Sequence, residues 1–133
     1  AIGRSPLFFG GHLPVSDDWT LSLITNAEVL AVNQESRNNR QLFRANGLAA
    51  WTADEAEGGG KYIALFNTSD RGEHGPEAGT AVPVRFSDLG FAGPVAVKDV
   101  WSGTDVGVFT GEFAPVVPYH GAGLYRLTAA GAR

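Results

Sequence analysis

The three histidines of the chain, His12, His74 and His120, are the side chains best suited to acid–base or metal chemistry. None stands at metal-ligand spacing from a second histidine, and the chain has 0 cysteines, so we expect no metal site. His12 is the candidate to pursue, because it follows Gly10-Gly11 directly after an apolar segment typical of a buried strand. Sites in parallel sheets form where the carboxyl ends of the strands meet.

The acidic side chains form no pair that spacing alone brings together. Asp17 and Asp18 stand at the expected start of a helix, where negative charge complements the helix dipole. Asp54, Glu55 and Glu57 border a run of glycines, and we expect them to be solvated. No serine has the Gly-x-Ser-x-Gly setting of a hydrolase nucleophile, and no Lys-Ser/Thr follows the glycine run to bind phosphate. The chain therefore shows no complete catalytic constellation, and no cofactor is expected.

Composition indicates a globular protein of ordinary domain size. The 133 residues are 44% hydrophobic and 18% charged, which favours a folded core over disorder. The net charge is -4 and the basic residues are scattered, so we expect no nucleic-acid partner. The longest apolar runs, such as Leu7 to Phe9, are far too short to cross a membrane, so we expect no membrane partner either.

The elements that would position His12 lie in the first 35 residues. An apolar run from Ile2 to Phe9 predicts a strand buried on both faces, as in a parallel sheet, and Gly10-Gly11 predicts a loop. Ser16 is a plausible N-cap for a helix that ends near Asn26, and Asn26 can cap a further helical turn. This order of elements is half of a β/α unit without partner strands.

The predicted helix has one broad apolar face with no evident partner in the chain. Trp19, Leu21, Leu23 and Ile24 recur at three- and four-residue spacing along it. An unsatisfied face of this kind marks an interface. We expect the helix either to fold onto the rest of the chain or to mediate self-association.

The pattern changes to β-structure after residue 40. The polar segment 36–40 is a fair linker, and Asn46-Gly47 is a strong hairpin signal. Alternating apolar residues then predict about seven or eight short strands at a spacing of roughly 8–12 residues, typical of an antiparallel sandwich. We therefore predict a mostly β chain: residues 39–133 form an antiparallel two-sheet β-sandwich, and residues 1–38 a strand-and-helix remnant of another architecture.

Aromatic side chains in the predicted sandwich leave a second function open. Trp51, Tyr62, Trp101 and Tyr119 could stack on sugar rings if they were exposed and coplanar, as in a carbohydrate-binding module. The alternative is core packing, because the tryptophans sit in periodic apolar patterns. Asn67-Thr68-Ser69 also matches a glycosylation acceptor, a triplet that is common by chance.

Several separate stretches resemble family 27 glycoside hydrolases, the α-galactosidases and α-N-acetylgalactosaminidases, and bacterial members most of all. "RSPLFFGGHL" and "LSLITNAEVLAVNQES" are similar to the last strand and last helix of their catalytic (β/α)8 barrel. "YIALFNTSD", "VRFSDLGF", "VKDVWSGTDVG" and "VPYHGAGLYRLT" are similar to their C-terminal antiparallel domain. The likeness covers nearly the whole chain, and two positions depart from the family pattern, His12 and Glu35, where aspartate is usual.

The resemblance implies a C-terminal, non-catalytic piece of an enzyme that cleaves terminal α-galactosides. The family's retaining mechanism uses two carboxyl groups, and no position here matches the motifs that carry them, so the chain alone should be inactive. The missing barrel would be its partner. Gly10, Gly11 and His12 would then lie near the rim of the sugar pocket in the parent enzyme. A free-standing interaction domain with an enzyme-derived fold is a third possibility.

Overall fold

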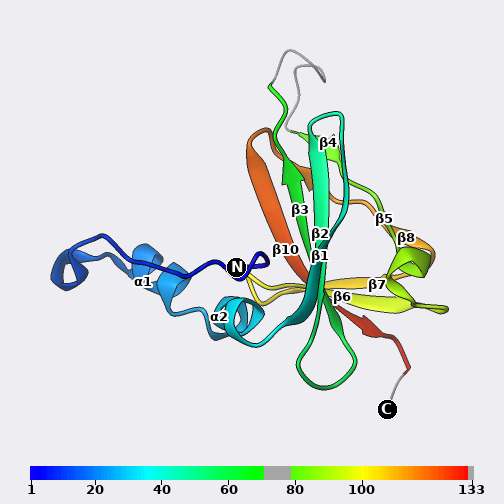
Figure 1. Ribbon diagram of the computed structural model, residues 1–133, viewed down its shortest axis with the longest axis horizontal. Helices are drawn as coiled ribbons and strands as arrows, with labels where there is room; N and C mark the ends of the chain where they lie inside the picture. Colours follow the sequence, from blue (N-terminus) through cyan, green and yellow to red (C-terminus); the bar gives the residue numbers. More distant parts are fainter. Residues whose placement is uncertain (71–78, 132–133) are drawn as a thin grey trace.

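A six-stranded antiparallel sheet forms the centre of the structure, a computed structural model that describes residues 1–70 and 79–131 (Figure 1). The strand order is β1-β2-β3-β10-β6-β7, so the last strand of the chain pairs between β3 and β6. The strands are β1 (Arg37–Ala45), β2 (Leu48–Asp54), β3 (Lys61–Asn67), β6 (Val95–Asp99), β7 (Asp105–Phe109) and β10 (Gly121–Ala129). His74, one of the three histidines considered above, lies outside the described residues.

A second, broken layer covers one face of this sheet. It consists of two short antiparallel pairs and one helical turn: β4 (Thr80–Ala81) with β9 (Val116–Val117), β5 (Val84–Arg85) with β8 (Glu112–Phe113), and η2 (Phe86–Leu89). Pro83 separates β4 from β5, and a proline cannot donate a ladder hydrogen bond. The described residues thus form ten strands where we predicted seven or eight, because the second layer is interrupted.

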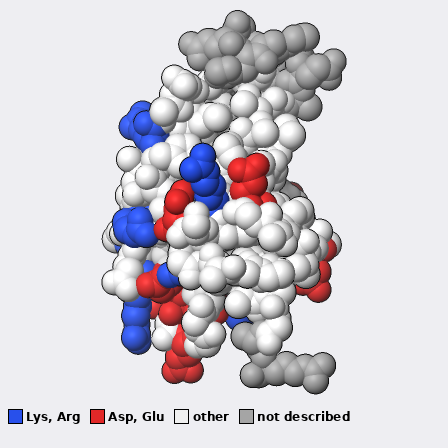
Figure 2. Space-filling view, turned by 90° about the vertical axis from the view of Figure 1, so that its right-hand side faces the viewer, with Lys and Arg blue, Asp and Glu red and all other residues white. Residues whose placement is uncertain are grey.

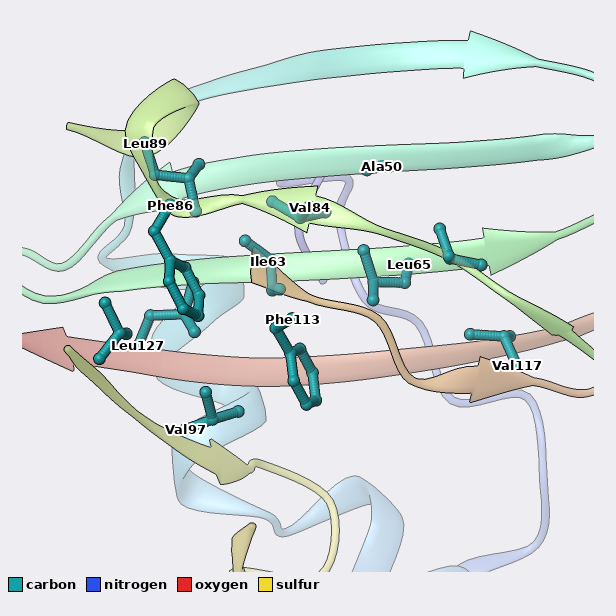
Figure 3. Packing of buried hydrophobic residues seen from close by; sticks show 12 residues of the cluster. Ala50, Ile63, Leu65, Val84, Phe86, Leu89, Val97, Phe113, Val117 and Leu127 are labelled. Carbon is teal, nitrogen blue, oxygen red and sulfur yellow. The ribbon is translucent and has the colours of Figure 1, made fainter. Parts of the chain in front are cut away.

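The main core lies between the two layers, and its members follow the predicted alternation. Val82, Val84 and Phe86 all point inward from the second layer, and Val97 and Leu127 meet them from the sheet. Figure 3 shows Val84 and Phe86 facing Val97 and Leu127 between the layers. The prediction of a mostly β, antiparallel sandwich is confirmed.

The predicted hairpin turn at Asn46-Gly47 is also confirmed. Both residues have positive φ, +50° and +73°, as a tight two-residue turn between β1 and β2 requires. A Cβ atom on Gly47 would lie 2.0 Å from the Ser69 Oγ, so glycine is required here for space as well as for backbone conformation.

The opposite face of the sheet is covered by a helix from the N-terminal segment. This segment contains η1 (Leu13–Val15), α1 (Asp18–Ile24) and α2 (Ala27–Gln34). Val29 and Val32 of α2, together with Ile2, form a second buried cluster with Tyr62 and Leu124 of the sheet. The sheet is therefore buried on both faces, by strands on one side and by α2 on the other (Figure 1).

Two polar contacts fix α2 at its amino-terminal end. The Asn26 side chain caps α2 by accepting hydrogen bonds from the amides of Glu28 and Val29, and its Nδ2 donates to the Val100 carbonyl at 3.3 Å. The Glu28 carboxylate pairs with the Lys98 ammonium of β6 at 2.7 Å. Asn26 is thus a cap, as predicted, and also a link to the sheet.

Arg4 fixes α2 at its carboxyl end. Its guanidinium donates to the carbonyls of Asn33, Gln34 and Ser36 at 3.1, 2.7 and 2.9 Å. The first two carbonyls lie in the last turn of α2 and the third just beyond it, where a positive charge complements the helix dipole. The Asn33 side chain donates in turn to the Ser5 carbonyl at 2.8 Å, so residues 4 and 5 are held against the end of the helix.

Three local predictions for the first 40 residues are wrong. The segment from Ile2 to Phe9 forms no strand, because nothing in the described chain offers it a neighbouring strand and Pro6 lacks a donor. The N-cap of α1 is Asp17, whose carboxylate accepts from the Thr20 amide at 2.7 Å, and not Ser16. The expected linker 36–40 is mostly strand, since β1 begins at Arg37 and pairs with β2.

Two acids that were expected to be solvated form ion pairs instead. Asp54 pairs with Lys61 across the β2–β3 hairpin and accepts from the Asn38 amide at 2.7 Å. Glu55 pairs with Arg126 of β10, and its side chain is 8% exposed. The glycine run folds the β2–β3 turn back, which brings both carboxylates beside the sheet.

Replacement of Arg4 by alanine tests how firmly the N-terminal segment is attached. We expect Arg4→Ala to lower the free energy of unfolding by about 1–2 kcal/mol, because it leaves three helix-end carbonyls without their charged donor. Urea unfolding followed by tryptophan fluorescence measures this change. The control is Arg44→Ala, at an exposed arginine of β1, which should cost less than about 0.5 kcal/mol. Equal effects would show that the Arg4 contacts contribute nothing specific.

The contacts of Asp54 with Asn38 and Lys61 should make the stability of the fold depend on pH in the acid range. The hydrogen bond from Asn38, and then the Lys61 pair, lower the pKa of Asp54 below its ordinary value. A carboxyl with a depressed folded pKa stabilises the fold above its unfolded pKa, about 3.9, and loses that contribution as the pH falls through the folded value.

Asp54→Asn should therefore destabilise the protein at pH 7, by less than about 1 kcal/mol for so exposed a pair. Below the folded pKa of Asp54 the difference between variant and wild type should vanish. Denaturant titrations at pH 7, 5, 4 and 3 measure it. A constant difference across this range would contradict the assignment.

Candidate interface on the N-terminal segment

The largest apolar hollow near the predicted site lies between the N-terminal segment, α2 and the β6–β7 turn. Its volume is about 580 Å³. It is lined by Ala1, Leu7, Phe8, Phe9, Leu13, Leu23, Ile24, Val29, Leu30, Gln34 and Trp101. Apart from Gln34 these side chains are all apolar, so the groove can bury apolar surface but offers no acid–base pair.

The walls of this groove are incompletely packed. Phe8 is 91% exposed, and Leu7, Phe9 and Leu13 are exposed as well. In the sequence this run predicted a buried strand, and the structure leaves it on the surface. Apolar side chains gathered in this way on one surface are typical of an interface.

Helix α1 continues the apolar surface away from the sandwich. It contains no buried residue, and Trp19 is 69% exposed. Figure 1 shows α1 projecting to one side of the sheet, beyond α2. Of its four apolar residues, Leu23 and Ile24 line the groove, whereas Trp19 and Leu21 face outward. Of the two expected alternatives, folding of the whole apolar face onto the rest of the chain is not observed, and self-association through it stays a prediction.

The three predicted rim residues, Gly10, Gly11 and His12, lie together at the edge of the groove. All three are exposed, and their neighbours Phe9 and Leu13 line the groove wall. A Cβ atom on Gly11 would lie 2.5 Å from the Phe9 ring, so glycine allows that ring to fold over the backbone. The His12 carbonyl accepts from the Val15 amide at 3.1 Å and starts η1, whereas its side chain makes no cap hydrogen bond.

The other titratable groups form no catalytic centre in the part of the chain that the structure describes. His120 pairs with Asp70 at 2.8 Å on the surface, far in sequence from His12. The Asp99 carboxylate accepts from the amides of Trp101 and Ser102 and so closes the β6–β7 turn. Within residues 1–70 and 79–131 no three acidic or histidine side chains gather as a metal site would require.

The charged surface and the helices add two further observations. On the face shown in Figure 2, lysines and arginines lie among aspartates and glutamates. Among the described residues no helix has the length and apolar character needed to cross a membrane.

Three of the four aromatic residues proposed as a sugar-binding platform do not form one exposed surface. Tyr62 is 6% exposed and belongs to the cluster beneath α2, where burial and then the Glu55 charge raise its pKa. Trp51 packs against the same cluster. Trp101 is 45% exposed, but it lies in the β6–β7 turn, away from the cluster that contains Tyr62. Asn67 is buried and its Nδ2 donates to the Val117 carbonyl at 3.0 Å, which excludes glycosylation of the folded chain.

Comparison with known proteins matches the sandwich to one family. The family model described as the alpha galactosidase C-terminal beta sandwich domain matches residues 45–127. The α-galactosidase of Cyamopsis tetragonoloba is 27% identical in an alignment 132 residues long, which covers 96% of this chain and 30% of that protein. The α-galactosidase of Oryza sativa subsp. japonica gives the same figures.

A solved structure extends the match over the N-terminal segment. The GH27 β-L-arabinopyranosidase of Geobacillus stearothermophilus is 39% identical, with a TM-score of 0.87 over 99% of this chain and 28% of that enzyme. The chain thus spans about 30% of the length of the curated relatives it matches. By its family model and by these neighbours, the chain belongs to the α-galactosidase C-terminal β-sandwich family, as the C-terminal region of a family 27 glycoside hydrolase.

Proposed function

We propose that this chain is the non-catalytic structural end of a retaining glycoside hydrolase, and that its N-terminal segment docks onto the enzyme's catalytic barrel. The observation that supports this most is the apolar surface of residues 7–24, which stays exposed beside a well-packed sandwich. The relatives supply a reason for that exposure, because about 70% of their length has no counterpart in this chain. That remaining length is large enough to hold a barrel of about 250 residues.

Residues 1–38 would be the last β/α unit of that barrel. In a closed barrel the segment around Leu7 to Phe9 would pair with strands on both sides, and α1 would pack on the outer face. The absence of a strand here then follows from the absence of its pairing partners. Gly10, Gly11 and His12 would lie at the carboxyl end of this strand, near the rim of the sugar pocket.

The proposed substrates are terminal α-galactosides, because the curated relatives are α-galactosidases. A second candidate is a β-L-arabinopyranoside, because the Geobacillus enzyme with that activity is 39% identical against 27% for the Cyamopsis α-galactosidase. The ratio of kcat/KM for the two aryl glycosides, measured on the complete enzyme that carries this chain, separates the two substrates.

A chimaera tests the structural role. The 133-residue chain replaces the corresponding C-terminal region of the Geobacillus enzyme, onto which 99% of this chain can be superposed. We expect the chimaera to hydrolyse an aryl β-L-arabinopyranoside with kcat/KM within about tenfold of the parent enzyme. The isolated chain should give no turnover of either aryl glycoside, because it holds no pair of catalytic carboxyl groups.

Two matched proteins serve as controls for the chimaera. The Geobacillus barrel without any C-terminal region should be less active and less stable than the chimaera. The same barrel joined to residues 37–133 alone should resemble the truncated barrel, because the docking segment is missing. Turnover by the isolated chain, or a chimaera no better than the truncated barrel, would refute the proposal.

Replacement of His12 in the chimaera tests the proposed pocket rim. A hydrogen bond to a neutral sugar hydroxyl contributes about 0.5–1.5 kcal/mol, so His12→Ala should lower kcat/KM about threefold to tenfold. The thermal midpoint should not change, because His12 is exposed. The matched control is His120→Ala, at an exposed histidine of the sandwich, which should leave kcat/KM unaltered. Unchanged kinetics in His12→Ala would remove this residue from the pocket.

A further inference from the structure

The exposed large apolar side chains of the described residues gather in two places. One is the N-terminal run of residues 7–21, and the other is the β6–β7 hairpin, with Trp101, Val106 and Val108. Among the large apolar residues that are exposed in the described chain, Val116 alone lies elsewhere, on β9. Val106 and Val108 of the hairpin therefore form a second apolar surface outside the lining of the N-terminal groove.

The strand register places Val108 on the same side of the sheet as α2. Val97 pairs with Gly107 and belongs to the core between the two layers. Its neighbour Ala96 pairs with Val108, so both point to the opposite face, because side chains alternate along a strand. A hollow of about 300 Å³ on the sheet contains Ala96 and Val108 in its lining, and α2 does not reach over it.

The hairpin and the N-terminal segment form one connected surface. Trp101, in the hairpin turn, lines the same groove as Leu7 and Phe9. The Asn26 side chain donates to the Trp101 carbonyl at 3.4 Å, and Glu28 of α2 pairs with Lys98 of β6. The two apolar surfaces are thus held in a fixed relation to each other.

The charges around the hollow favour an apolar partner. Lys98 and Arg126, which line it, are already paired with Glu28 and Glu55. Apolar side chains of a partner could cover these two pairs, whereas Asp105, which also lines the hollow and is exposed, would have to stay in contact with water, because an unpaired charge would be costly to bury.

A second copy of the chain fits this surface less well. Because β7 is an edge strand, it could in principle pair with another β7. However, the β6–β7 register shifts at Val106, and Gly107 has φ +138°, so the strand carries a bulge near its middle. Bulges of this kind twist an edge away from further pairing.

We propose that the β6–β7 hairpin, through Trp101, Val106 and Val108, is a second docking element for the catalytic domain, continuous with the N-terminal groove. This inference rests on the proposed function, since the partner is the same barrel. It adds a second contact between the two domains. Apolar side chains on the outer surface of the barrel would contact the sandwich sheet directly, in addition to the N-terminal segment that joins the barrel to the sandwich.

The substitution Val108→Lys in the Geobacillus chimaera tests this docking element. We expect it to lower the thermal midpoint of the chimaera by about 2–4 °C, because a lysine at a covered apolar position is left without a partner. The same substitution in the isolated chain should shift the midpoint by less than about 1 °C, because the position is 62% exposed there. The matched control is Val116→Lys, 63% exposed on β9, which should alter neither protein.

The outcomes separate this inference from the proposed function. If the unsubstituted chimaera is active and Val108→Lys behaves like Val116→Lys, the hairpin is not a docking element, and the proposed function stands. If light scattering shows a dimer of the isolated chain that Val108→Lys dissociates, the occupant is a second copy, and the inference is wrong. If the unsubstituted chimaera fails to fold, the proposed function fails, and this inference fails with it.

Discussion

The structure depends on the burial of one sheet on both of its faces. The interrupted second layer covers one face and α2 covers the other, so neither cover can be removed without exposing apolar strands to water. The α2 cover is short, and its own packing rests on two buried valines and Ile2. Its position therefore depends on polar contacts at each end, from Asn26 to the Val100 carbonyl just after β6 and from Arg4 to carbonyls at the end of the helix. Residues near the amino terminus are in this way part of the stability of a sandwich formed by residues after 36.

Sequence reasoning succeeded where local chemistry decides the structure. Alternation at Val82, Val84 and Phe86 is a period-two signal, and the side chains are buried as it indicates. Asn46-Gly47 supplies the positive φ angles that its turn needs. The strand predicted for the apolar residues before Gly10 was wrong, because an apolar run indicates burial but does not say what buries it. A strand also needs neighbours, and the described chain contains none for this segment.

The contacts that hold the candidate interface and the sheet in place were the hardest to predict, because they join residues far apart in the sequence. The contacts of Arg4 join residues about 30 positions apart, and nothing in the local sequence distinguishes this arginine from the others. Glu55 appeared solvated because glycines follow it, yet the turn they form returns the side chain to Arg126. Trp101 lies outside β6 because the Asp99 carboxylate closes a turn just after that strand. Each of these outcomes was decided by long-range packing or by turn geometry.

Helix α1 shows how the interface and the fold depend on each other. It has seven residues, and isolated helices shorter than about 12–15 residues are marginal in water. Its cap at Asp17 is sound, but none of its side chains is fully buried, and only Leu23 and Ile24 line the groove beside α2. A partner that covers Trp19 and the groove beside it would supply the missing burial, and binding to the folded form alone stabilises that form. The α2 contacts hold the start of this surface in place, which reduces the ordering cost of docking. The two domains would then stabilise each other, since the barrel orders α1 and the sandwich holds α1 in position for the barrel.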